Sequence, residues 1–523
     1  MADKNSQFYR NIVKRAREKT KTIHKSWVGV GTGLKAVLTD LTIVFQLAVL
    51  AFIYAFFAYL FPTFFYISVG LTALSAIHVF ISERDEQTKA SWMLLFALSF
   101  GCGYIVYILA DKRVCYGYNR RRYAKINERS KSFVPQFATD GAPAVIANDC
   151  EYIYNVSGYV PYRNTRLKYF SNSRDILNNI IEMIENAKDF VFMEFFIVAD
   201  GILLDRLVAA CKRKTAEGVK IYVLCDDVGC AGVLSNSAIK RLKDAGVHFK
   251  IFEKLFTLFS FGLNFRDHRK IVVVDGKTGY TGGFNFIDDC ANMRKMQGIW
   301  KDSGVRIEGE GVDGLTLAFI RQWEFATKEQ LDYAEFTGKY DKFESDSVVL
   351  PYAGGPEICE NLCRGVYANM IAGAQKTLYI MTPYLIPDGE ILSLIKHKAR
   401  SGVDVRIVLP GVPDYNYIHR VTRSNAERLL KYGVKIYYAR SEFVHGKVML
   451  TENCLAVGSV NMDMRAFYQE FDNGVYTDDS MARKEVLSDF NNIFDNNEPS
   501  YSVTRNPLTL FIACILRIVS PLM

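Results

Sequence analysis

The amino-terminal part of the chain carries long hydrophobic runs that no charged residue interrupts. Residues 41–82 contain no Asp, Glu, Lys or Arg, and Pro62 is the main break in this run. One membrane-spanning helix needs about 20 apolar residues, so the run predicts two helices, near 41–61 and 64–82, folded as a hairpin. A second uncharged run at 90–110 is also long enough to span, although glycines weaken its middle. We therefore expect a membrane region of two or three transmembrane helices at residues 41–110.

Between residues 174 and 480 the pattern changes to short β-branched runs that alternate with helical stretches, which is typical of an α/β domain. Two parts of this region match each other. The first runs from DFVFMEFFIVAD to DHRKIVVVD, and the second runs from KTLYIMTPYLIPD to VHGKVMLTE. In each part, three strands separated by two helices precede an H-x-K segment. Two copies of one unit predict a duplicated α/β domain with pseudo-twofold symmetry, whose H-x-K segments meet at the shared centre.

The two parts differ in length just before the H-x-K segment. Gly246 precedes His268 by 22 residues, whereas Gly433 precedes His445 by 12. Much of the added length is the aromatic stretch EKLFTLFSFGLNFRD. Two interpretations of this loop are open: it lies on the bilayer and admits acyl chains, or it packs into the core.

These patterns divide the chain into six segments. They are a basic cytoplasmic amino terminus (1–40), the membrane region (41–110), a basic linker leading into the domain (111–173), the first repeat (174–340), the second repeat (341–500) and an apolar tail (501–523). We expect the tail to associate with the membrane, with packing against the core as an equal alternative.

The net charge of +8 is concentrated beside the hydrophobic runs. Residues 1–39 hold nine Lys and Arg against two acidic residues, and residues 111–135 hold eight against two. The remainder, 136–523, carries a net charge of −3. Basic segments that flank apolar runs favour anchoring at an anionic lipid surface. A catalytic region with a net negative charge disfavours nucleic acid as a partner.

The eleven cysteines include no CxxC pair, and no histidines cluster near the most closely spaced cysteines. This pattern indicates no zinc site and favours free thiols in a reducing compartment.

The basic stretch 112–131 follows the last apolar run, and the positive-inside tendency places it in the cytoplasm. We therefore expect a multi-pass protein of the cell membrane with its catalytic domain on the cytoplasmic face. If the basic amino terminus is also inside, the crossings are even in number, so 41–82 spans as a hairpin and 90–110 lies re-entrant or along the interface. Three true crossings would place the catalytic domain outside.

The two H-x-K segments carry the candidate chemistry. His268 and Lys270 open one of them, His445 and Lys447 open the other, and each is followed by a glycine turn and an asparagine. Residues two apart in a strand share a face, so each histidine and its lysine point the same way. Two such sets that face each other would place two imidazoles, two ammonium groups and two amides around one small anion. This composition suits phosphoryl transfer without a metal, in which one imidazole attacks phosphorus and the other protonates the departing alkoxide.

The duplicated motif resembles the phospholipase D superfamily, and the whole chain resembles the bacterial cardiolipin synthases of that type. The likeness covers the amino-terminal hydrophobic runs and the segments DHRKIVVVDGKTGYTGGFN, GIWKDSGVRIEGEGV, TPYLIPD, SGVDVRIVLPG and GSVNMDMRAF. The resemblance implies the catalytic motif residues His268, Lys270, Asp275, His445, Lys447 and Glu452. It also implies that Asn285, Asn461 and Ser459 bind phosphate and that Asp302 and Asp472 orient the imidazoles, with Glu470 as a near competitor of Asp472. No cofactor and no metal are expected.

One position departs from the family pattern. The second motif ends in Glu452 where the family has Asp, and its gap to Gly458 is one residue shorter than the gap from Asp275 to Gly282. The motif acid lies five residues after its lysine, on the opposite face of the strand, and we interpret it as a structural hydrogen-bond partner. An added methylene can be absorbed there, so we expect activity to be retained.

The expected function is that of a membrane-bound phosphatidyltransferase, by resemblance a cardiolipin synthase. It would convert two phosphatidylglycerol molecules to cardiolipin and glycerol through a phosphatidyl-histidine intermediate. The alternatives are a phospholipase D-type hydrolase, a phosphatidyltransferase with another alcohol acceptor, and a catalytically inactive membrane scaffold. Phosphatidylglycerol and membrane lipids are the expected partners, and the sequence leaves the oligomeric state open.

Overall fold

The computed structural model describes residues 48–49, 52–57, 59–99, 101–110, 117–253, 265–294, 298–356, 360–501 and 516. The chain divides into two compact units. One unit comprises the chain up to Arg84 together with Trp92–Tyr107, and the other comprises Asp85–Ser91 and the chain from Ile108 onward. The basic amino terminus, most of the aromatic loop before His268 and nearly all of the apolar tail lie outside the described residues, so both interpretations of the loop and of the tail stay predictions.

The smaller unit is built from apolar helices. Helix α3 (Pro62–Ile81) is 20 residues long, and within the described chain it alone is long and apolar enough to cross a membrane. It corresponds to the second predicted span but begins at Pro62 rather than at 64, because the first turn of a helix tolerates a residue without an N–H. Of the first predicted span, 41–61, about half of the residues are described, and 48–49, 52–57 and 59–60 among them are helical.

The uncharged run 90–110 is divided between two helices, α4 (Glu86–Leu98) and α5 (Gly103–Ala110). The hydroxyl of Thr72 in α3 donates to the carbonyl of Gly101 at 2.6 Å and accepts from the N–H of Tyr104 at 3.3 Å. This side chain therefore satisfies backbone groups that the break would leave unpaired in an apolar environment. Gly101 has a φ of +94°, which L side chains rarely adopt, so the break depends on glycine at that position.

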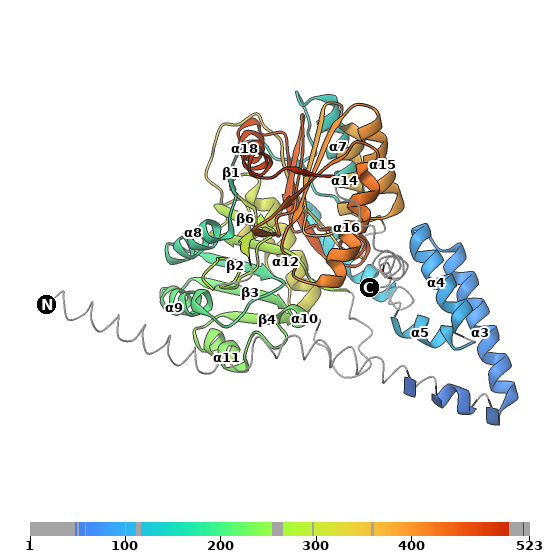
Figure 1. Ribbon diagram of the computed structural model, residues 1–523. Coiled ribbons are helices and arrows are strands. Elements are labelled where there is room, and N and C mark those ends of the chain that lie inside the picture. The colour runs from blue at the N-terminus through green and yellow to red at the C-terminus, as the bar shows by residue number, and fades with distance from the viewer. Residues whose placement is uncertain are drawn as a thin grey trace. The chain divides into compact units, whose positions relative to one another are not determined.

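The larger unit contains two sheets of matching topology (Figure 1). The first sheet has the order β1-β8-β6-β5-β2-β3-β4, with β2, β3 and β4 parallel and the other pairs antiparallel. Its strands are β1 (Thr165–Phe170), β2 (Phe190–Phe195), β3 (Lys220–Asp226), β4 (His248–Phe252), β5 (Lys270–Val274), β6 (Thr278–Gly282) and β8 (Gly304–Gly309). Strand β1 lies before residue 174, where the sequence pattern places the start of the first repeat.

The second sheet repeats this arrangement. Its order is β19-β13-β12-β10-β15-β16-β18-β9, and from β9 to β13 it matches the first sheet, from β1 to β4, strand for strand. Its strands are β9 (Val349–Gly354), β10 (Thr377–Met381), β12 (Asp404–Pro410), β13 (Lys435–Ala439), β15 (Val448–Thr451), β16 (Leu455–Gly458), β18 (Asp472–Thr477) and β19 (Pro499–Ser500). The duplicated α/β fold predicted from the sequence is therefore confirmed. Two short parallel pairs complete the strands, β7 (Ile299–Lys301) with β14 (Glu442–Val444) and β11 (Leu385–Ile386) with β17 (Met462–Asp463).

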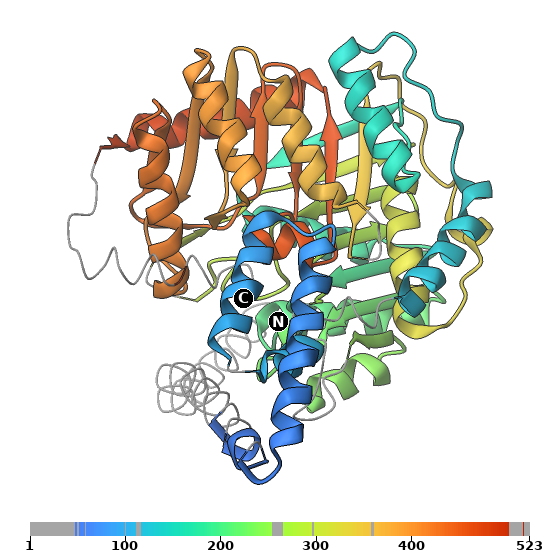
Figure 2. The same ribbon diagram turned by 90° about the vertical axis from the view of Figure 1, so that its right-hand side faces the viewer.

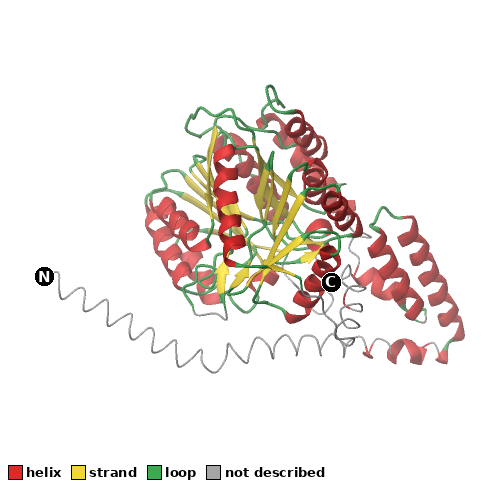
Figure 3. Ribbon diagram, turned by 45° about the horizontal axis from the view of Figure 1, so that its top comes forward, coloured by secondary structure: helices red, strands yellow, loops and turns green. Residues whose placement is uncertain are grey.

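Helices flank the strands of both sheets (Figures 1 and 3). Along the first sheet lie α8 (Ser173–Glu185), α9 (Ile202–Ala216) and α11 (Asn236–Asp244). Along the second lie α7 (Ala144–Ser157), α14 (Leu362–Gly373), α15 (Gly389–Arg400) and α16 (Asn416–Leu430), and Figure 2 shows the gold and orange helices α14 to α16 in front of its strands. Helix α6 (Gly117–Ser130) leads into the domain, and short helices in the connections are η2 (Lys131–Phe133), α10 (Asp227–Cys230), α13 (Tyr333–Phe336) and α17 (Met464–Tyr468).

Two equivalent helices lie between the sheets. Helix α12 (Val312–Thr327) follows β8 and packs on β2, β5 and β9, while α18 (Ser480–Asn496) follows β18 and packs on β1, β13 and β15. Each helix contacts strands of both sheets, so the two repeats share one hydrophobic core. This sharing fixes the geometry of any site that both repeats build.

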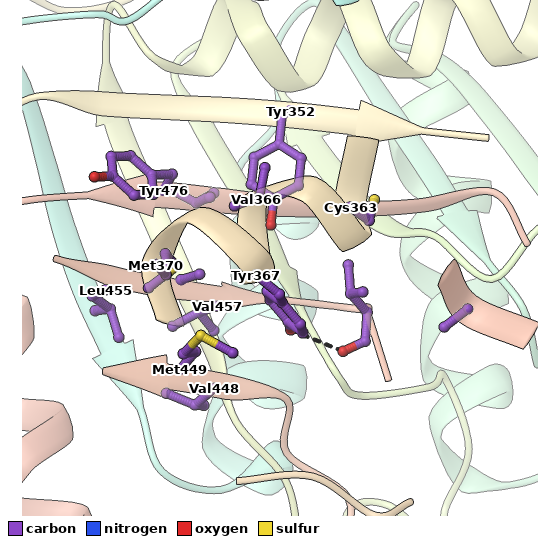
Figure 4. Close-up of a cluster of buried hydrophobic side chains, with 14 of the residues drawn as sticks. Tyr352, Cys363, Val366, Tyr367, Met370, Val448, Met449, Leu455, Val457 and Tyr476 are labelled. Atoms are coloured by element: carbon purple, nitrogen blue, oxygen red, sulfur yellow. Dashed lines mark hydrogen bonds between the residues drawn. The ribbon is translucent and has the colours of Figure 1, made fainter. Parts of the chain in front are cut away.

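Apolar packing in the second repeat reaches the predicted site. Side chains of α14 and of the central strands form a buried cluster (Figure 4), which includes Val366, Tyr367, Met370, Met449, Leu455 and Val457. The hydroxyl of Tyr367 donates to the carbonyl of Val460 at 2.9 Å. Because Val460 immediately precedes Asn461, this bond anchors the Gly-Ser-Val-Asn turn to the core.

Candidate active site

The two H-x-K segments lie together where the sheets face each other. The N–H of His268 donates to the carbonyl of Phe471 at 2.9 Å, and the N–H of His445 donates to the carbonyl of Lys301 at 2.7 Å. Phe471 belongs to the second repeat and Lys301 to the first. Each histidine is therefore held through its backbone by the other repeat.

The carboxylates that touch the imidazoles are exchanged in the same way. Nδ1 of His268 lies 2.9 Å from Oδ1 of Asp472, and Nδ1 of His445 lies 2.7 Å from Oδ2 of Asp302. A carboxylate on Nδ1 fixes that nitrogen as the proton donor and leaves Nε2 as the free base. The structure thus brings together all four side chains, and each repeat supplies the acid for the other repeat's histidine.

Burial favours the neutral form of both imidazoles, and at His445 the carboxylate of Asp302 opposes this effect. Desolvation, followed by the neighbouring Lys270, lowers the pKa of His268 well below its usual value. Desolvation and Lys447 likewise lower the pKa of His445, although Asp302 opposes the shift. Burial would raise the pKa of Asp302, but His445 and Lys447 hold it below the usual value. Burial instead dominates at Asp472 and raises its pKa to about 6, so both carboxyls are ionised at neutral pH.

The two lysines lie beside the histidines of their own motifs. Lys270 and Lys447 are fully buried, and each ammonium donates to the carbonyl of the histidine two residues earlier. Desolvation lowers the pKa of Lys270 to about 7 and that of Lys447 to about 8. Each ammonium retains further N–H donors, and a bound anion would stabilise its charged form. The site is therefore built to receive negative charge.

The two asparagines follow the turns after β6 and β16. Oδ1 of Asn285 accepts from the N–H of Ile197 at 3.3 Å, whereas Oδ1 of Asn461 is buried without a partner. Across the described part of the chain, neither side-chain NH2 group donates a hydrogen bond to protein. Both amides can therefore donate to an anion.

Ser459, predicted to bind phosphate, has a different partner. Its hydroxyl donates to Oδ1 of Asp472 and accepts from the N–H of Asn473 at 2.9 Å. A serine hydroxyl has one hydrogen, so this geometry places Ser459 behind the carboxylate rather than on the anion. The first repeat has Gly283 at the equivalent position, where a Cβ would meet Oδ1 of Asp302 at 2.3 Å. The two carboxylates therefore have unequal surroundings.

The motif acids Asp275 and Glu452 lie at the far ends of β5 and β15. Asp275 accepts from the N–H groups of Lys188, Asp189 and Phe190 at 2.8 to 3.0 Å. Glu452 accepts from those of Gln375 and Thr377, before β10, at 2.7 and 3.1 Å. Both carboxylates tie a hairpin to the start of a neighbouring strand. They touch backbone and not the imidazoles, which favours the structural interpretation.

Different residues border the two imidazoles. The rings of Trp300 and Phe443 lie 5.0 and 5.7 Å from the ring of His445, and Nε1 of Trp300 donates to Asp302 at 3.1 Å. Beside His268, Oε2 of Glu470 lies 3.7 Å from Nδ1, and Oε1 lies 2.8 Å from Nε of Arg465. Sequence reasoning missed Trp300 and Arg465. Both residues lie in segments that carry the resemblance. The signal that could have identified them is their spacing, because Arg465 lies four residues after Asn461 and Trp300 lies two residues before Asp302.

Three of these side chains could hold a metal ion. Nδ1 of His268 and carboxylate oxygens of Glu470 and Asp472 lie within 4.8 Å of one another. The cations of Lys270, Lys447 and Arg465 border the same point and act electrostatically on these groups. Their positive charge favours an anion over a metal cation at this place.

Known proteins resemble this chain in sequence or in fold. The family model described as cardiolipin synthase, PLD-like domain, matches residues 180–296 and 367–496. A protein described as cardiolipin synthase 2 from Bacillus anthracis is 31% identical over 426 residues, which cover 79% of this chain and 82% of that protein. An uncharacterized protein of Streptococcus mutans is 30% identical over 467 residues, covering 86% of this chain and 99% of that protein. Among solved structures, phosphatidylserine synthase from Haemophilus influenzae matches with a TM-score of 0.56 at 14% identity, over 72% of this chain and all of that one, which is a likeness of fold.

Proposed function

The chain belongs to the cardiolipin synthase family of phospholipase D-like proteins, and from this premise we propose that it joins two phosphatidylglycerol molecules into cardiolipin and releases glycerol. The observation that carries the proposal is the pair of histidines, each bound at Nδ1 by a carboxylate of the other repeat. Two equivalent imidazoles suit a reaction in which one group is a nucleophile and the other moves the proton.

In the first step, Nε2 of His268 attacks the phosphorus of one phosphatidylglycerol. The P–N bond forms as the bond from phosphorus to the headgroup glycerol oxygen breaks. His445, protonated on Nε2, gives that proton to the departing oxygen, and free glycerol leaves. The ammonium groups of Lys270 and Lys447 and the amides of Asn285 and Asn461 stabilise the charge on the remaining phosphoryl oxygens.

In the second step, a headgroup hydroxyl of another phosphatidylglycerol attacks the same phosphorus. His445, now neutral, takes the hydroxyl proton, and the P–N bond to His268 breaks. The product is cardiolipin, and both histidines return to their starting protonation states. The strongly depressed pKa of His268 supports its role as the neutral nucleophile, and the ionised Asp302 beside His445 supports an imidazolium there.

Purified protein in detergent, given phosphatidylglycerol alone, should form cardiolipin and glycerol in equal amounts without added cation. Lipid extracts resolved by mass spectrometry, together with an enzymatic glycerol assay, measure both products. Phosphatidic acid as the main product would instead indicate the hydrolase. Folded protein with no turnover of any phosphodiester would indicate the inactive scaffold.

The nucleophile can be assigned by trapping the intermediate. With a phosphatidylglycerol labelled in its phosphatidyl part, His445→Asn should accumulate labelled protein, because deprotonation of the second lipid fails. His268→Asn should remain unlabelled, since it lacks the attacking nitrogen. Label on His445 in the His268→Asn protein would reverse the assignment.

We also propose that the protein is a multi-pass protein of the cell membrane with its catalytic domain on the cytoplasmic face. The long apolar helix α3 supports membrane insertion, and the basic stretch 112–131 supports the orientation. Single cysteines introduced at Lys4 and at Lys342 into a chain without other reactive thiols should both resist a membrane-impermeant reagent in intact cells. Modification at Lys342 but not at Lys4 would show an external catalytic domain.

A further inference from the structure

The pseudo-twofold symmetry of the site is broken by charge. Met462 in β17 pairs with Leu385, and Phe286 forms the equivalent bridge with Val198. Arg465 lies three residues after Met462, and Asp289 lies three residues after Phe286. Arg465 in the second repeat is therefore equivalent to Asp289 in the first. By the same equivalence, the Glu470 position corresponds to Trp300, because each stands two residues before its imidazole-bound aspartate.

Arg465 lies one side chain away from the imidazole of His268. Its Nε is 2.8 Å from Oε1 of Glu470, whose other oxygen is 3.7 Å from Nδ1 of His268. Arg465 stands on α17, which Asp463 caps by accepting from the N–H of Ala466 at 2.8 Å. The backbone that carries Arg465 is therefore anchored next to the Asn461 turn.

The guanidinium of Arg465 has N–H groups that can bind a ligand. Its side chain is 36% exposed, and Nε makes its contact with Glu470. Throughout the residues that the structure describes, neither terminal NH2 group of Arg465 donates a hydrogen bond to protein. A guanidinium with free N–H groups is the side chain best suited to a phosphodiester, which it can bind through two parallel hydrogen bonds.

In the proposed reaction, the acceptor lipid brings a second phosphodiester into the site. The acceptor phosphatidylglycerol attacks through one end of its glycerol, while its own phosphodiester stays attached at the other end. Only the three carbons of that glycerol separate the two phosphates in the product. In the proposed reaction Lys270, Lys447, Asn285 and Asn461 bind the reacting phosphate, so a further cation a few ångströms away would stabilise the phosphate of the acceptor.

We propose that Arg465 binds the non-reacting phosphodiester of the acceptor lipid and so selects an anionic alcohol over a neutral one. This inference rests on the proposed function. Glu470 holds the guanidinium at Nε, and the terminal N–H groups receive the acceptor's phosphate. The first repeat has an acidic residue at the equivalent place, so the charge directs the acceptor to one side of the pseudo-twofold axis.

Two reactions of the same enzyme separate this role from catalysis. Cardiolipin formation from phosphatidylglycerol uses an anionic acceptor, whereas exchange of radiolabelled glycerol into phosphatidylglycerol uses the same donor and a neutral acceptor. In Arg465→Gln, cardiolipin formation should fall by about tenfold to a hundredfold, the loss expected for a charge-assisted hydrogen bond, while glycerol exchange changes by less than about twofold. Arg465→Lys should lose less cardiolipin formation than Arg465→Gln, since it keeps the charge without the paired donors.

The matched control is Arg306→Gln. Arg306 is also a partly exposed arginine in an ion pair, 2.7 Å from Glu308 on β8, with 24% of its side chain exposed. Its replacement should leave both reactions unchanged. Thermal unfolding of each variant checks the fold, and if Arg465→Gln is unfolded, the ratio of the two reactions in Arg465→Lys decides the matter.

Three outcomes would overturn the inference. An equal loss of both reactions in Arg465→Gln would show that Arg465 acts through Glu470 on His268 rather than on the acceptor. If Arg465→Gln is unfolded, an equal loss of both reactions in Arg465→Lys would show the same. Unchanged cardiolipin formation would show that the acceptor's phosphate binds elsewhere. Wild-type protein that forms no cardiolipin at all would overturn the proposed function itself, which is a distinguishable result.

Discussion

Ser459 and Gly283 stand at equivalent places in the two repeats and give the two imidazole-bound carboxylates different partners. The hydroxyl of Ser459 donates to Asp472, and this hydrogen bond lowers a carboxyl pKa that burial otherwise raises. Asp302 receives instead the N–H of Ser303 at 2.9 Å and Nε1 of Trp300. The ionisation of Asp472 is thus the more easily disturbed of the two.

We expect Ser459→Ala to move the acidic limb of the activity profile upward in pH. Loss of the hydroxyl raises the pKa of Asp472 above its value of about 6, so a higher pH is needed to keep this carboxylate ionised and bound to Nδ1 of His268. The measurement is kcat/KM for cardiolipin formation between about pH 5 and pH 8. Ser157→Ala is the control, because it also removes a buried hydroxyl, one that donates to Ile153 within α7. An unshifted profile would mean that Ser459 does not tune Asp472.

Residue spacing alone could predict most of the side chains that the structure brings together. The duplicated spacing placed each histidine, lysine and asparagine, because strand alternation and glycine turns act over a few residues. The partner of Ser459 is thirteen residues away across a strand pair, and no local pattern encodes that contact. Spacing also could not predict that Asp302 and Asp472 each bind the histidine of the other repeat, because these contacts depend on how the two sheets dock.

The hairpins that carry the motif acids differ by one residue. In the first repeat Val274 pairs with Thr278, which leaves a loop of Asp275, Gly276 and Lys277. In the second, the N–H of Thr451 donates to the carbonyl of Cys454 at 2.9 Å, which leaves only Glu452 and Asn453 in the turn. This difference accounts for the shorter gap seen in the sequence. The longer side chain of Glu452 spans from the tighter turn to the N–H groups before β10.

Glu452→Asp should therefore destabilise the protein, although it restores the acid of the family motif. Loss of one methylene removes at least one of the two hydrogen bonds to Gln375 and Thr377, at a cost of about 1 kcal/mol at this partly exposed position. Denaturant unfolding in detergent measures the change. Asp479→Glu is the control, because it also changes the length of a carboxylate side chain by one methylene, at the N-cap of α18. Equal or greater stability of Glu452→Asp would show that the turn relaxes.

The same carboxylate gives a pH dependence. Burial opposes ionisation of Glu452, but N–H groups led by that of Thr377 lower its pKa below the usual value. A depressed folded-state pKa contributes stability above the unfolded value of about 4.3, and this contribution is lost as pH falls through the folded value. The stability difference between wild type and Glu452→Gln should be largest near neutral pH and shrink on acidification. A constant difference from neutral pH to below about pH 4 would contradict this assignment.

Element boundaries show where sequence patterns lose precision. The α/β alternation and both H-x-K strands were predictable because their hydrophobic periodicity is strong. The start of α3 at Pro62 and the division of 90–110 at Gly101 depend on single hydrogen bonds, such as that from Thr72, which periodicity does not report. Strand β1, which precedes the region of clear alternation, depends on pairing with β8.

At the scale of the whole molecule, each half of the proposed reaction draws on both repeats. Asp472→Asn should impair formation of the labelled intermediate, because it releases Nδ1 of His268. Asp302→Asn should resemble His445→Asn and let labelled protein accumulate, because without this carboxylate the neutral His445 is a weaker base for the hydroxyl of the second lipid. Each loss should be about a hundredfold or more in cardiolipin formation, and quantitative labelling separates the two variants. Identical labelling of both variants would contradict the assignment of roles by repeat.

The exchange of carboxylates has a consequence for synthesis of the chain. His268 lies in the first repeat, but the aspartate that orients it follows 204 residues later, close to the end of the second sheet. A nascent chain whose first repeat has already emerged from the ribosome still lacks this carboxylate and the backbone carbonyl of Phe471 that holds the histidine. Such a chain carries a reactive residue in the presence of lipid without the means to use it. In the proposed mechanism, activity therefore requires that translation has passed Asp472 and that the two repeats have docked.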